Sequence, residues 1–466
     1  MKYISTRGAA PVLDFDDVLL AGLARDGGLY VPESWPHFSA DKLRTLKSLS
    51  YPELAFEIIK PFVGDTVENA DLKRILADAY SHFDTSEVAP LKKTGDNEYL
   101  LELFHGPTIA FKDMAMQFLG PMFDHILKQK KQRVTIVGAT SGDTGSAAIE
   151  ACRDRDAIDI FILYPEGRVS DVQRKQMTTV KAANVHCIAV KGTFDDCQDM
   201  VKALFNDTNF RDHWHLSAVN SINWARIVAQ IVYYFWAALK AGAPDTSVSF
   251  AVPTGNFGNV FAGYAASQMG LPIQKLIVGS NSNDILTRFF DTGTMEMSGV
   301  NPTISPSMDI QVSSNFERLL FDLFDRDGDA VKRAIDGFRE TGTFNVTEAQ
   351  HKMAQELFEA VRFDDNQTKA MIARFLAETG ELLDPHSAIG VAAAQAAGRH
   401  PDHPVISLAT AHPAKFPDAV KAASGQHPEL PAHMSDLLDR DEKTDVIDND
   451  LDKVREHIIA TLESAA

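Results

Sequence analysis

Short runs of apolar, mostly β-branched residues recur along this chain of 466 residues, and longer stretches of mixed polarity separate them. The runs are residues 133–137, 159–164, 185–190, 247–252, 275–279 and 405–409. Since they do not alternate with polar positions, they predict strands buried on both faces of a mostly parallel sheet. Apolar positions with a period of 3.6 residues predict helices at 111–129, 143–153, 195–206, 221–240 and 257–269. The alternation of these elements predicts an α/β fold.

Other regions of the chain depart from this alternation. Residues 1–90 predict a mainly helical N-terminal module, whereas residues 91–428 carry all six apolar runs. Residues 329–379 are again helical and charged, and they precede the last run. Residues 429–466 predict an acidic, solvated tail that closes with a terminal helix. Because there is neither an internal repeat nor a low-complexity linker, we expect packed lobes rather than tethered ones.

The charge and the cysteines narrow the class of protein. The chain has 45 Lys and Arg residues against 64 Asp and Glu residues, and this charge of −19 argues against partners such as nucleic acids or anionic membranes. The apolar run at 227–239 is shorter than the roughly 20 residues that cross a bilayer, so it predicts a buried helix. Cys152, Cys187 and Cys197 are too scattered for a disulfide framework, and the first residues lack the apolar core of a signal peptide. We therefore expect a cytoplasmic protein.

Two strand–loop–helix junctions carry the strongest local signals for ligand binding. GATSGDTGSAA (138–148) follows the first predicted strand, and PTGNFGNVFAG (253–263) follows the fourth. At a helix start the free N–H groups and the helix dipole favour an anion, and glycine lets the backbone approach it closely. The alternative is that Ser and Thr merely cap the helices while Gly serves tight turns. Two such loops at the ends of strands favour a binding site, because open α/β sheets bind ligands there.

The anion is not expected to belong to a nucleotide. No two glycines are separated by a single residue, so the G-x-G-x-x-G dinucleotide fingerprint is absent. There is no Gly-Lys dipeptide either, which excludes a Walker A loop. These absences favour a phosphorylated cofactor that also needs a lysine.

Lys112 fits this requirement, because it lies in the largely apolar segment HGPTIAFKDMAMQF at 105–118. A poorly solvated ammonium group has a lowered pKa, and its amine becomes a nucleophile able to form a Schiff base. The alternative is a lysine that extends to solvent from a helix start. Beside two anion-binding loops, Lys112 makes pyridoxal phosphate a consistent cofactor, with one loop for its phosphate and the other for the carboxylate of an amino acid.

Five segments of the chain resemble the threonine synthase family. They are HGPTIAFKD, GATSGDTGSAA, NSINWARI (220–227), PTGNFGN and TAHPAKF (410–416), and the opening MKYISTRG with LAGLARDGGLYVPE is similar as well. Their order and spacing resemble the longer bacterial and fungal branch, from residue 1 to about residue 425. The resemblance implies the fold type II of pyridoxal-phosphate-dependent enzymes, which is tryptophan synthase β-like. Two twisted, mostly parallel sheets would form two α/β lobes in residues 91–428, the smaller at about 130–225.

The resemblance also implies which residues bind the cofactor. Lys112 would carry it as a Schiff base, and Thr410 would face the pyridine nitrogen with a hydroxyl that does not hold a proton there. Asp143 stands where the fold often has an asparagine, which leaves its contact with the ring hydroxyl open. The cup for the cofactor phosphate would consist of Gly255, Asn256, Phe257, Gly258 and Asn259.

The implied reaction converts O-phospho-L-homoserine and water to L-threonine and phosphate, which is the work of a carbon–oxygen lyase acting on phosphates in threonine biosynthesis. Ser141 and Thr144 are the candidates for the substrate carboxylate. Arg226, with Ser221 and Asn223, is the candidate for the substrate phosphate, because a cation beside hydroxyl and amide donors suits that group. The alternative is that Arg226 pairs with a structural carboxylate.

Two other functions stay open at this point. One is a related phospho-lyase that releases phosphate and forms a keto acid, and the other is a non-catalytic binding module. A monomer is expected, with a homodimer as the alternative.

The remaining histidines give no separate site. His213 and His215 are expected on one face of a strand without a third ligand, so no metal site is predicted. His105 and His412 flank the recognised motifs, and they either line the pocket or bond the backbone.

Overall fold

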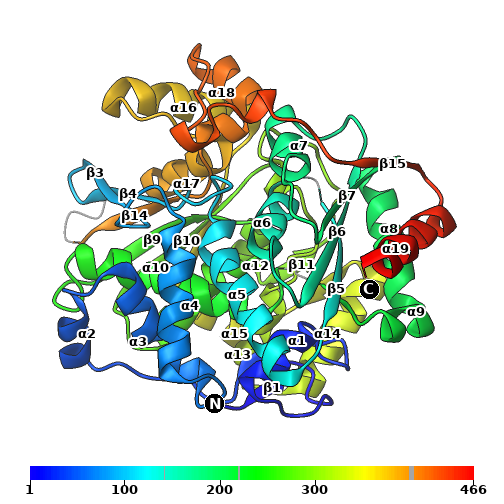
Figure 1. Cartoon of the computed structure of the whole chain (residues 1–466). Coiled ribbons are helices and arrows are strands. Elements are labelled where there is room, and N and C mark those ends of the chain that lie inside the picture. Colours follow the sequence, from blue (N-terminus) through cyan, green and yellow to red (C-terminus); the bar gives the residue numbers. More distant parts are fainter. Residues whose placement is uncertain (141, 219–220, 398–402, 466) are drawn as a thin grey trace. The chain divides into compact units, whose positions relative to one another are not determined.

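The computed structural model describes residues 1–140, 142–218, 221–397 and 403–465 (Figure 1). The chain forms two compact units, each with its own sheet and core. The first unit comprises Met1–Ala115 and Ser221–Pro428, and the second comprises Met116–Asn220 and Glu429–Ala466.

The strands are β1 (Tyr3–Ser5), β2 (Tyr30–Pro32), β3 (Leu91–Gly95), β4 (Glu98–Glu102), β5 (Val134–Ala139), β6 (Ile158–Pro165), β7 (Val185–Lys191), β8 (Leu216–Ser217), β9 (Val248–Pro253), β10 (Ile273–Ser280), β11 (Thr294–Glu296), β12 (Thr343–Asn345), β13 (Phe358–Arg362), β14 (Val405–Ala409) and β15 (Asp445–Asp448). The helices are α1 (Phe15–Ala21), α2 (Ala40–Leu46), α3 (Tyr51–Val63), α4 (Asn69–Ser81), α5 (Lys112–Lys130), α6 (Asp143–Cys152), α7 (Asp171–Thr178), α8 (Phe194–Asn206), α9 (Thr208–His213), α10 (Trp224–Lys240), α11 (Gly258–Gln268), α12 (Ile285–Thr292), α13 (Phe316–Leu323), α14 (Gly328–Thr341), α15 (Glu348–Leu357), α16 (Asp365–Thr379), α17 (Pro385–Ala396), α18 (Pro417–Ser424) and α19 (Leu451–Ala465).

The first unit is built on a six-stranded sheet with the order β13-β10-β9-β14-β4-β3. Its neighbouring strands are parallel except for β3, which runs antiparallel to β4. The middle strand β9 is buried along its whole length. Helix α17 packs across β9, β10 and β14, and helix α10, buried from Trp224 to Leu239, packs against α11 (Figure 1). The sheet therefore places the ends of β9, β10 and β14 next to one another, under the loops that carry the predicted motifs.

The N-terminal segment is anchored in the first unit by a buried ion pair. Arg7 donates from Nε and Nη2 to the two carboxylate oxygens of Glu317 on α13, at 3.1 and 3.0 Å. The hydroxyl of Thr6 donates to the same carboxylate at 2.6 Å. This arrangement ties the opening motif of the sequence to the helix that follows residues 301–315.

The second unit holds a five-stranded, entirely parallel sheet with the order β15-β7-β6-β5-β8. Its core joins buried side chains of β5, β6 and β7 to α8 and α19, with Phe161, Cys197 and Ile458 fully buried. Figure 1 shows α19 beside α8 and β15 beside β7. The acidic segment after residue 428 thus contributes a strand and a helix to this unit.

The predicted fold class is confirmed, and the six apolar runs and five helical stretches each coincide with an element of the structure. Two expectations were wrong. The stretch 329–379 holds β12 and β13 besides its helices, and β13 is the edge strand beside β10. His213 ends α9 and His215 lies in a turn, so the two do not share a strand. In the described ranges, no helix is both long and apolar enough to cross a membrane.

Candidate active site

The loop that leads to Lys112 is paired with the segment that carries Thr410. Phe111 donates its backbone N–H to the carbonyl of Thr410 at 2.8 Å, and His412 donates its N–H to the carbonyl of Ile109 at 3.0 Å. Lys112 follows directly as the first residue of α5. The structure therefore brings Lys112 and Thr410 together, although about 300 residues separate them in the sequence.

Lys112 stands between an aromatic residue and a buried aspartate in the sequence. Its side chain is half-buried, and its Nζ lies 5.4 Å from the centre of the Phe111 ring. The fully buried Asp113 accepts hydrogen bonds from the N–H and the hydroxyl of Thr108, both at 2.7 Å. Ile109 has a φ of 54°, which is rare for a β-branched residue and common in strained loops at functional sites. These contacts hold the lysine at a fixed helix start.

Thr410 has a hydroxyl that is available to a ligand. Its backbone N–H donates to Ser387 Oγ at 2.9 Å, and its side chain is 5% exposed. Its hydroxyl forms no hydrogen bond with any residue in the described part of the chain. A hydroxyl in this position can contact a pyridine nitrogen without holding a proton on it.

The loop from Gly255 to Asn259 forms a cradle of backbone donors at the start of α11. None of its N–H groups has an acceptor among the residues that the structure describes. Phe257 adopts the left-handed conformation with a φ of 61° and caps the helix. A Cβ on Gly255 would lie only 2.8 Å from the carbonyl oxygen of Ser307, so the backbone fits there only as glycine. Free donors at a helix start fit a phosphate, and this loop can therefore hold the cofactor phosphate.

Residues that the sequence analysis missed support this cradle from behind. Ser313 donates its hydroxyl to the carbonyl of Gly255 at 2.7 Å. The amide of Asn315 donates to the carbonyls of Asn256 and Ser221 at 3.1 and 3.2 Å. Asn315 is fully buried, so it joins the cradle to the segment before α10. A lone Asn or Ser in a loop gives no sequence signal for such a role.

The two buried residues of the cup serve it in different ways. Phe257 packs in a cluster with Phe290, Phe316 and Phe358. The Oδ1 of Asn259 accepts hydrogen bonds from two tyrosine hydroxyls on α10, whereas its buried Nδ2 has no partner in the described ranges. The exposed parts of the cup are thus the backbone and Asn256.

Arg226 is a buried cation in the first turn of α10. It is 4% exposed, and its Nε and Nη1 are buried without a hydrogen-bond partner among the described residues. No carboxylate in the same part of the chain pairs with it, and burial lowers its pKa to about 10. An unpaired buried charge is costly, so its retention indicates a site for an anion.

The other two residues of that motif lie beside Arg226. Asn223 caps α10 by accepting the N–H of Ala225 at 3.0 Å, and it donates to the carbonyl of Leu19 at 2.8 Å. Both polar atoms of its amide therefore have a partner within the protein. Ser221 is half-buried, and its carbonyl accepts the bond from Asn315 described above.

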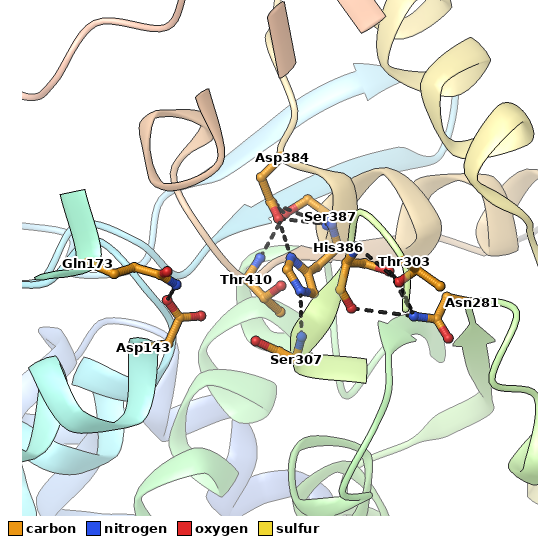
Figure 2. Close-up of polar contacts among 10 residues, drawn as sticks. Asp143, Gln173, Asn281, Thr303, Ser307, Asp384, His386, Ser387 and Thr410 are labelled. Carbon is orange, nitrogen blue, oxygen red and sulfur yellow. Dashed lines mark hydrogen bonds and ion pairs between the residues drawn. The ribbon is translucent and has the colours of Figure 1, made fainter. Parts of the chain in front are cut away.

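The second unit carries the other predicted loop, between β5 and α6. Thr140 Oγ1 accepts the N–H groups of Gly142 and Gly145 at 3.0 and 2.9 Å. Gln173 donates from Nε2 to the buried Asp143 at 2.8 Å, as Figure 2 shows. Thr144 is half-buried in the first turn. Ser141, the other candidate for the substrate carboxylate, lies outside the described residues.

The two histidines of the motifs have opposite environments. His105 bonds Asp84 and Glu102 through its two ring nitrogens, at 2.7 and 2.8 Å. Burial alone would lower its pKa, but the hydrogen bond to Glu102 and the two negative charges outweigh burial and raise the pKa. Burial and the charge of His105 lower the pKa of His412 to about 4. His412 is therefore neutral, and its Nδ1 accepts the N–H of Ala414 at 3.2 Å.

A lysine at a helix start, a free hydroxyl on the paired strand end and a glycine-lined phosphate cradle define a pyridoxal-phosphate-dependent enzyme of fold type II. The family model described as "Pyridoxal-phosphate dependent enzyme" matches residues 87–336. The models "Threonine synthase N terminus" and "Threonine synthase, C-terminal" match residues 2–80 and 387–458. The chain belongs to the threonine synthase family.

Its relatives support this membership over the full length. A threonine synthase of Pseudomonas aeruginosa is 55% identical over 98% of this chain and 97% of its own length. The solved structure of a pyridoxal-phosphate-bound threonine synthase from Brucella melitensis is 54% identical, with a TM-score of 0.98 over 99% of both chains. That of the yeast enzyme is 40% identical, with a TM-score of 0.95 over 99% of both chains. These matches confirm the predicted family, fold type, enzyme class and cofactor.

Proposed function

We propose that the chain converts O-phospho-L-homoserine and water to L-threonine and phosphate, with Lys112 as the lysine that carries the cofactor. The observation that carries this proposal is the presence of Lys112, Thr410 and the Gly255–Asn259 cradle in one unit, which also holds the unpaired Arg226. The cradle takes the phosphate of the cofactor, and Thr410 faces its ring nitrogen. Arg226, helped by Ser221 at the start of α10, takes the phosphate of the substrate.

Each group has a defined task in this reaction. Bound pyridoxal phosphate supplies an electron sink for the negative charge that develops on the amino acid. The amine of Lys112 removes the α proton of the substrate and returns protons in later steps. Arg226 stabilises the phosphate as it leaves Cγ. Ser141 and Thr144 in the second unit are proposed to bind the substrate carboxylate, and Asp143 to contact the cofactor ring.

The test combines product analysis with a spectrum. The purified protein is incubated with pyridoxal phosphate and O-phospho-L-homoserine, and the products are identified. We expect L-threonine and phosphate in equal amounts, together with a near-visible absorption band that changes when the substrate is added. Lys112→Ala should lose both the activity and the band. Lys352→Ala, which changes an exposed lysine on α15, should keep both.

Three other outcomes would contradict the proposal. 2-Oxobutyrate in place of threonine would assign a related phospho-lyase. A colourless protein without turnover would assign a non-catalytic module. A band that persists in Lys112→Ala would show that another lysine carries the cofactor.

The surroundings in which the enzyme works are also proposals. The three cysteines are free and buried, which suits a reducing compartment, so we place the enzyme in the cytoplasm. A monomer is proposed, and light scattering at working concentration would distinguish it from a homodimer.

A further inference from the structure

A buried carboxylate, Asp384, lies between the two parts of the cofactor site. It is fully buried at the start of α17 and accepts four hydrogen bonds (Figure 2). Oδ1 accepts from the backbone N–H and Nδ1 of His386, at 2.9 and 2.8 Å. Oδ2 accepts the backbone N–H of Ser387 at 3.2 Å and also its hydroxyl. Both oxygens are therefore saturated, and neither is left for a ligand.

One arm of this cluster reaches the residue that faces the ring nitrogen. The hydroxyl of Ser387 donates a hydrogen bond to Asp384. This orients Ser387 Oγ to accept the backbone N–H of Thr410 at 2.9 Å. Thr410 comes directly after β14, where the strand ladder no longer holds its backbone. Ser387, together with Phe111 on the Thr410 carbonyl, thus holds the backbone from which the free hydroxyl of Thr410 projects.

The other arm reaches the phosphate cradle. His386 accepts the backbone N–H of Ser307 at its Nε2, at 3.3 Å, so this nitrogen carries no proton and Nδ1–H is the donor to Asp384. Ser307 lies in the short 3₁₀ turn Pro306–Met308. The carbonyl oxygen of that residue lies 2.8 Å from where a Cβ on Gly255 would be, so the turn forms the wall behind the cradle.

We propose that Asp384 is a positioning residue that holds both ends of the cofactor at once, Thr410 through Ser387 and the wall behind Gly255 through His386. The inference rests on the proposed function, because it assumes that these two places receive the ring and the phosphate. The physical reason is that two backbone segments far apart in the sequence share one rigid acceptor. Displacing the carboxylate therefore moves both segments.

A simpler role for Asp384 is that of a helix N-cap, and the two roles predict different results. Asn caps helices as well as Asp does, so Asp384→Asn leaves a mere cap intact. An amide has a single acceptor oxygen, however, and its NH₂ group must face the donors of either Ser387 or His386. Asp384→Asn therefore breaks at least one arm if the carboxylate is needed for both.

The test measures binding rather than turnover. Apoprotein is titrated with pyridoxal phosphate and with pyridoxal, which lacks the phosphate, and inorganic phosphate is added as a competitor of pyridoxal phosphate. Ser387→Ala should weaken pyridoxal binding about tenfold and leave the phosphate competition unchanged, as expected for one lost hydrogen bond. His386→Ala should weaken the phosphate competition about tenfold and leave pyridoxal unchanged. Asp384→Ala should show both losses, and about a hundredfold loss for pyridoxal phosphate.

Two controls keep the result decisive. Asp364→Ala removes the side-chain cap of the neighbouring helix α16 and should leave all three affinities unchanged. If Asp384→Ala does not fold, Asp384→Asn takes its place. This variant must weaken either pyridoxal binding or the competition by inorganic phosphate. The inference would be overturned if the Asp384 variants changed neither pyridoxal binding nor phosphate competition. It would also be overturned if they changed only the affinities that Asp364→Ala changes as well. Failure of the unchanged protein to bind pyridoxal phosphate would instead overturn the proposed function.

Discussion

Replacing Arg226 with methionine should stabilise the protein and at the same time damage the enzyme. The side chain is buried, and its Nε and Nη1 meet no acceptor among the described residues. Methionine has a similar volume and no charge, so Arg226→Met removes a desolvated cation without opening a large cavity. If Arg226 served only the stability of the fold, Arg226→Met should instead destabilise the protein and leave substrate binding unchanged.

The magnitude follows from the pKa. Burial lowers the pKa of Arg226 from 12.5 to about 10. Each tenfold change in proton affinity is about 1.4 kcal/mol, so the charged form is disfavoured by about 3 kcal/mol in the folded protein. Because the folded pKa is the lower one, this cost is complete below pH 10 and disappears only as the pH rises towards 12.5. At pH 7 the substitution should therefore raise the free energy of unfolding by about 1–3 kcal/mol, after some loss of packing.

Catalysis should change in the other direction. Two charge-assisted hydrogen bonds to a phosphate contribute about 3 kcal/mol or more, so kcat/KM for O-phospho-L-homoserine should fall about 100-fold. Inorganic phosphate, a product, should inhibit the enzyme with its cofactor bound about 100-fold more weakly. Urea denaturation of the apoprotein and steady-state kinetics measure the two effects separately.

Arg318 provides the matched control for this experiment. It is equally buried, and burial lowers its pKa to about 9, but its guanidinium donates to the carbonyls of Tyr30 and Ile222 and to Oδ1 of Asn315. Arg318→Met leaves these oxygens without donors and should lower the free energy of unfolding by about 2 kcal/mol or more. An Arg226→Met protein that is destabilised in the same way, with unchanged phosphate inhibition, would refute the anion site.

Three further predictions concern the cradle and the lysine loop. Gly255→Ala places a Cβ 2.8 Å from a backbone oxygen and should weaken pyridoxal phosphate at least about tenfold in an absorption titration, whereas Gly337→Ala, with no atom within 4 Å, should not. Asn315→Ala removes three hydrogen bonds and should lower the free energy of unfolding by about 2–3 kcal/mol in urea, together with weaker phosphate binding. Since two carboxylates raise the pKa of His105 above 6.5, its stabilising contribution is complete below about pH 6.5 and is lost as the pH rises through the raised pKa. Urea denaturation across that range should show this loss in the unchanged protein and not in His105→Gln.

The elements and the first contacts of the site were largely predictable from the sequence. Buried parallel strands such as β6 and β9 are continuous apolar runs in the sequence, and helix starts rich in glycine indicate anion sites. Lys112 was identifiable because a lysine in an apolar segment needs an explanation. Strand β13 was missed because it is a half-buried edge strand, FEAVR, between two charged helices. Its pattern is not distinguishable from that of a continuing helix.

The residues that support the site were not predictable, because their roles depend on partners far along the chain. Asp384, followed by Pro385, reads as an ordinary helix cap, and only the fold shows that Thr410 and Ser307 depend on it. The sequence gives no signal for Asn315 either, since its amide donates hydrogen bonds to the carbonyls of segments about 60 and 90 residues away. Hydrogen bonds to backbone groups leave no motif, because many residue types can donate or accept at such places.

The same distances in sequence explain why the cofactor should act on folding as well as on chemistry. The Lys112 loop bonds the Thr410 segment, and the Gly255–Asn259 cradle bonds Ser313, only when the first unit is folded, because these contacts close loops of roughly 300 and 60 residues. A ligand that binds this arrangement has no site on the unfolded chain, and it stabilises the folded state by about 2.7 kcal/mol at roughly 100 times its Kd. The stabilisation by pyridoxal phosphate is then a direct measure of how well the backing residues hold the site. A variant such as Ser387→Ala should lose part of it even where the protein without cofactor is as stable as before.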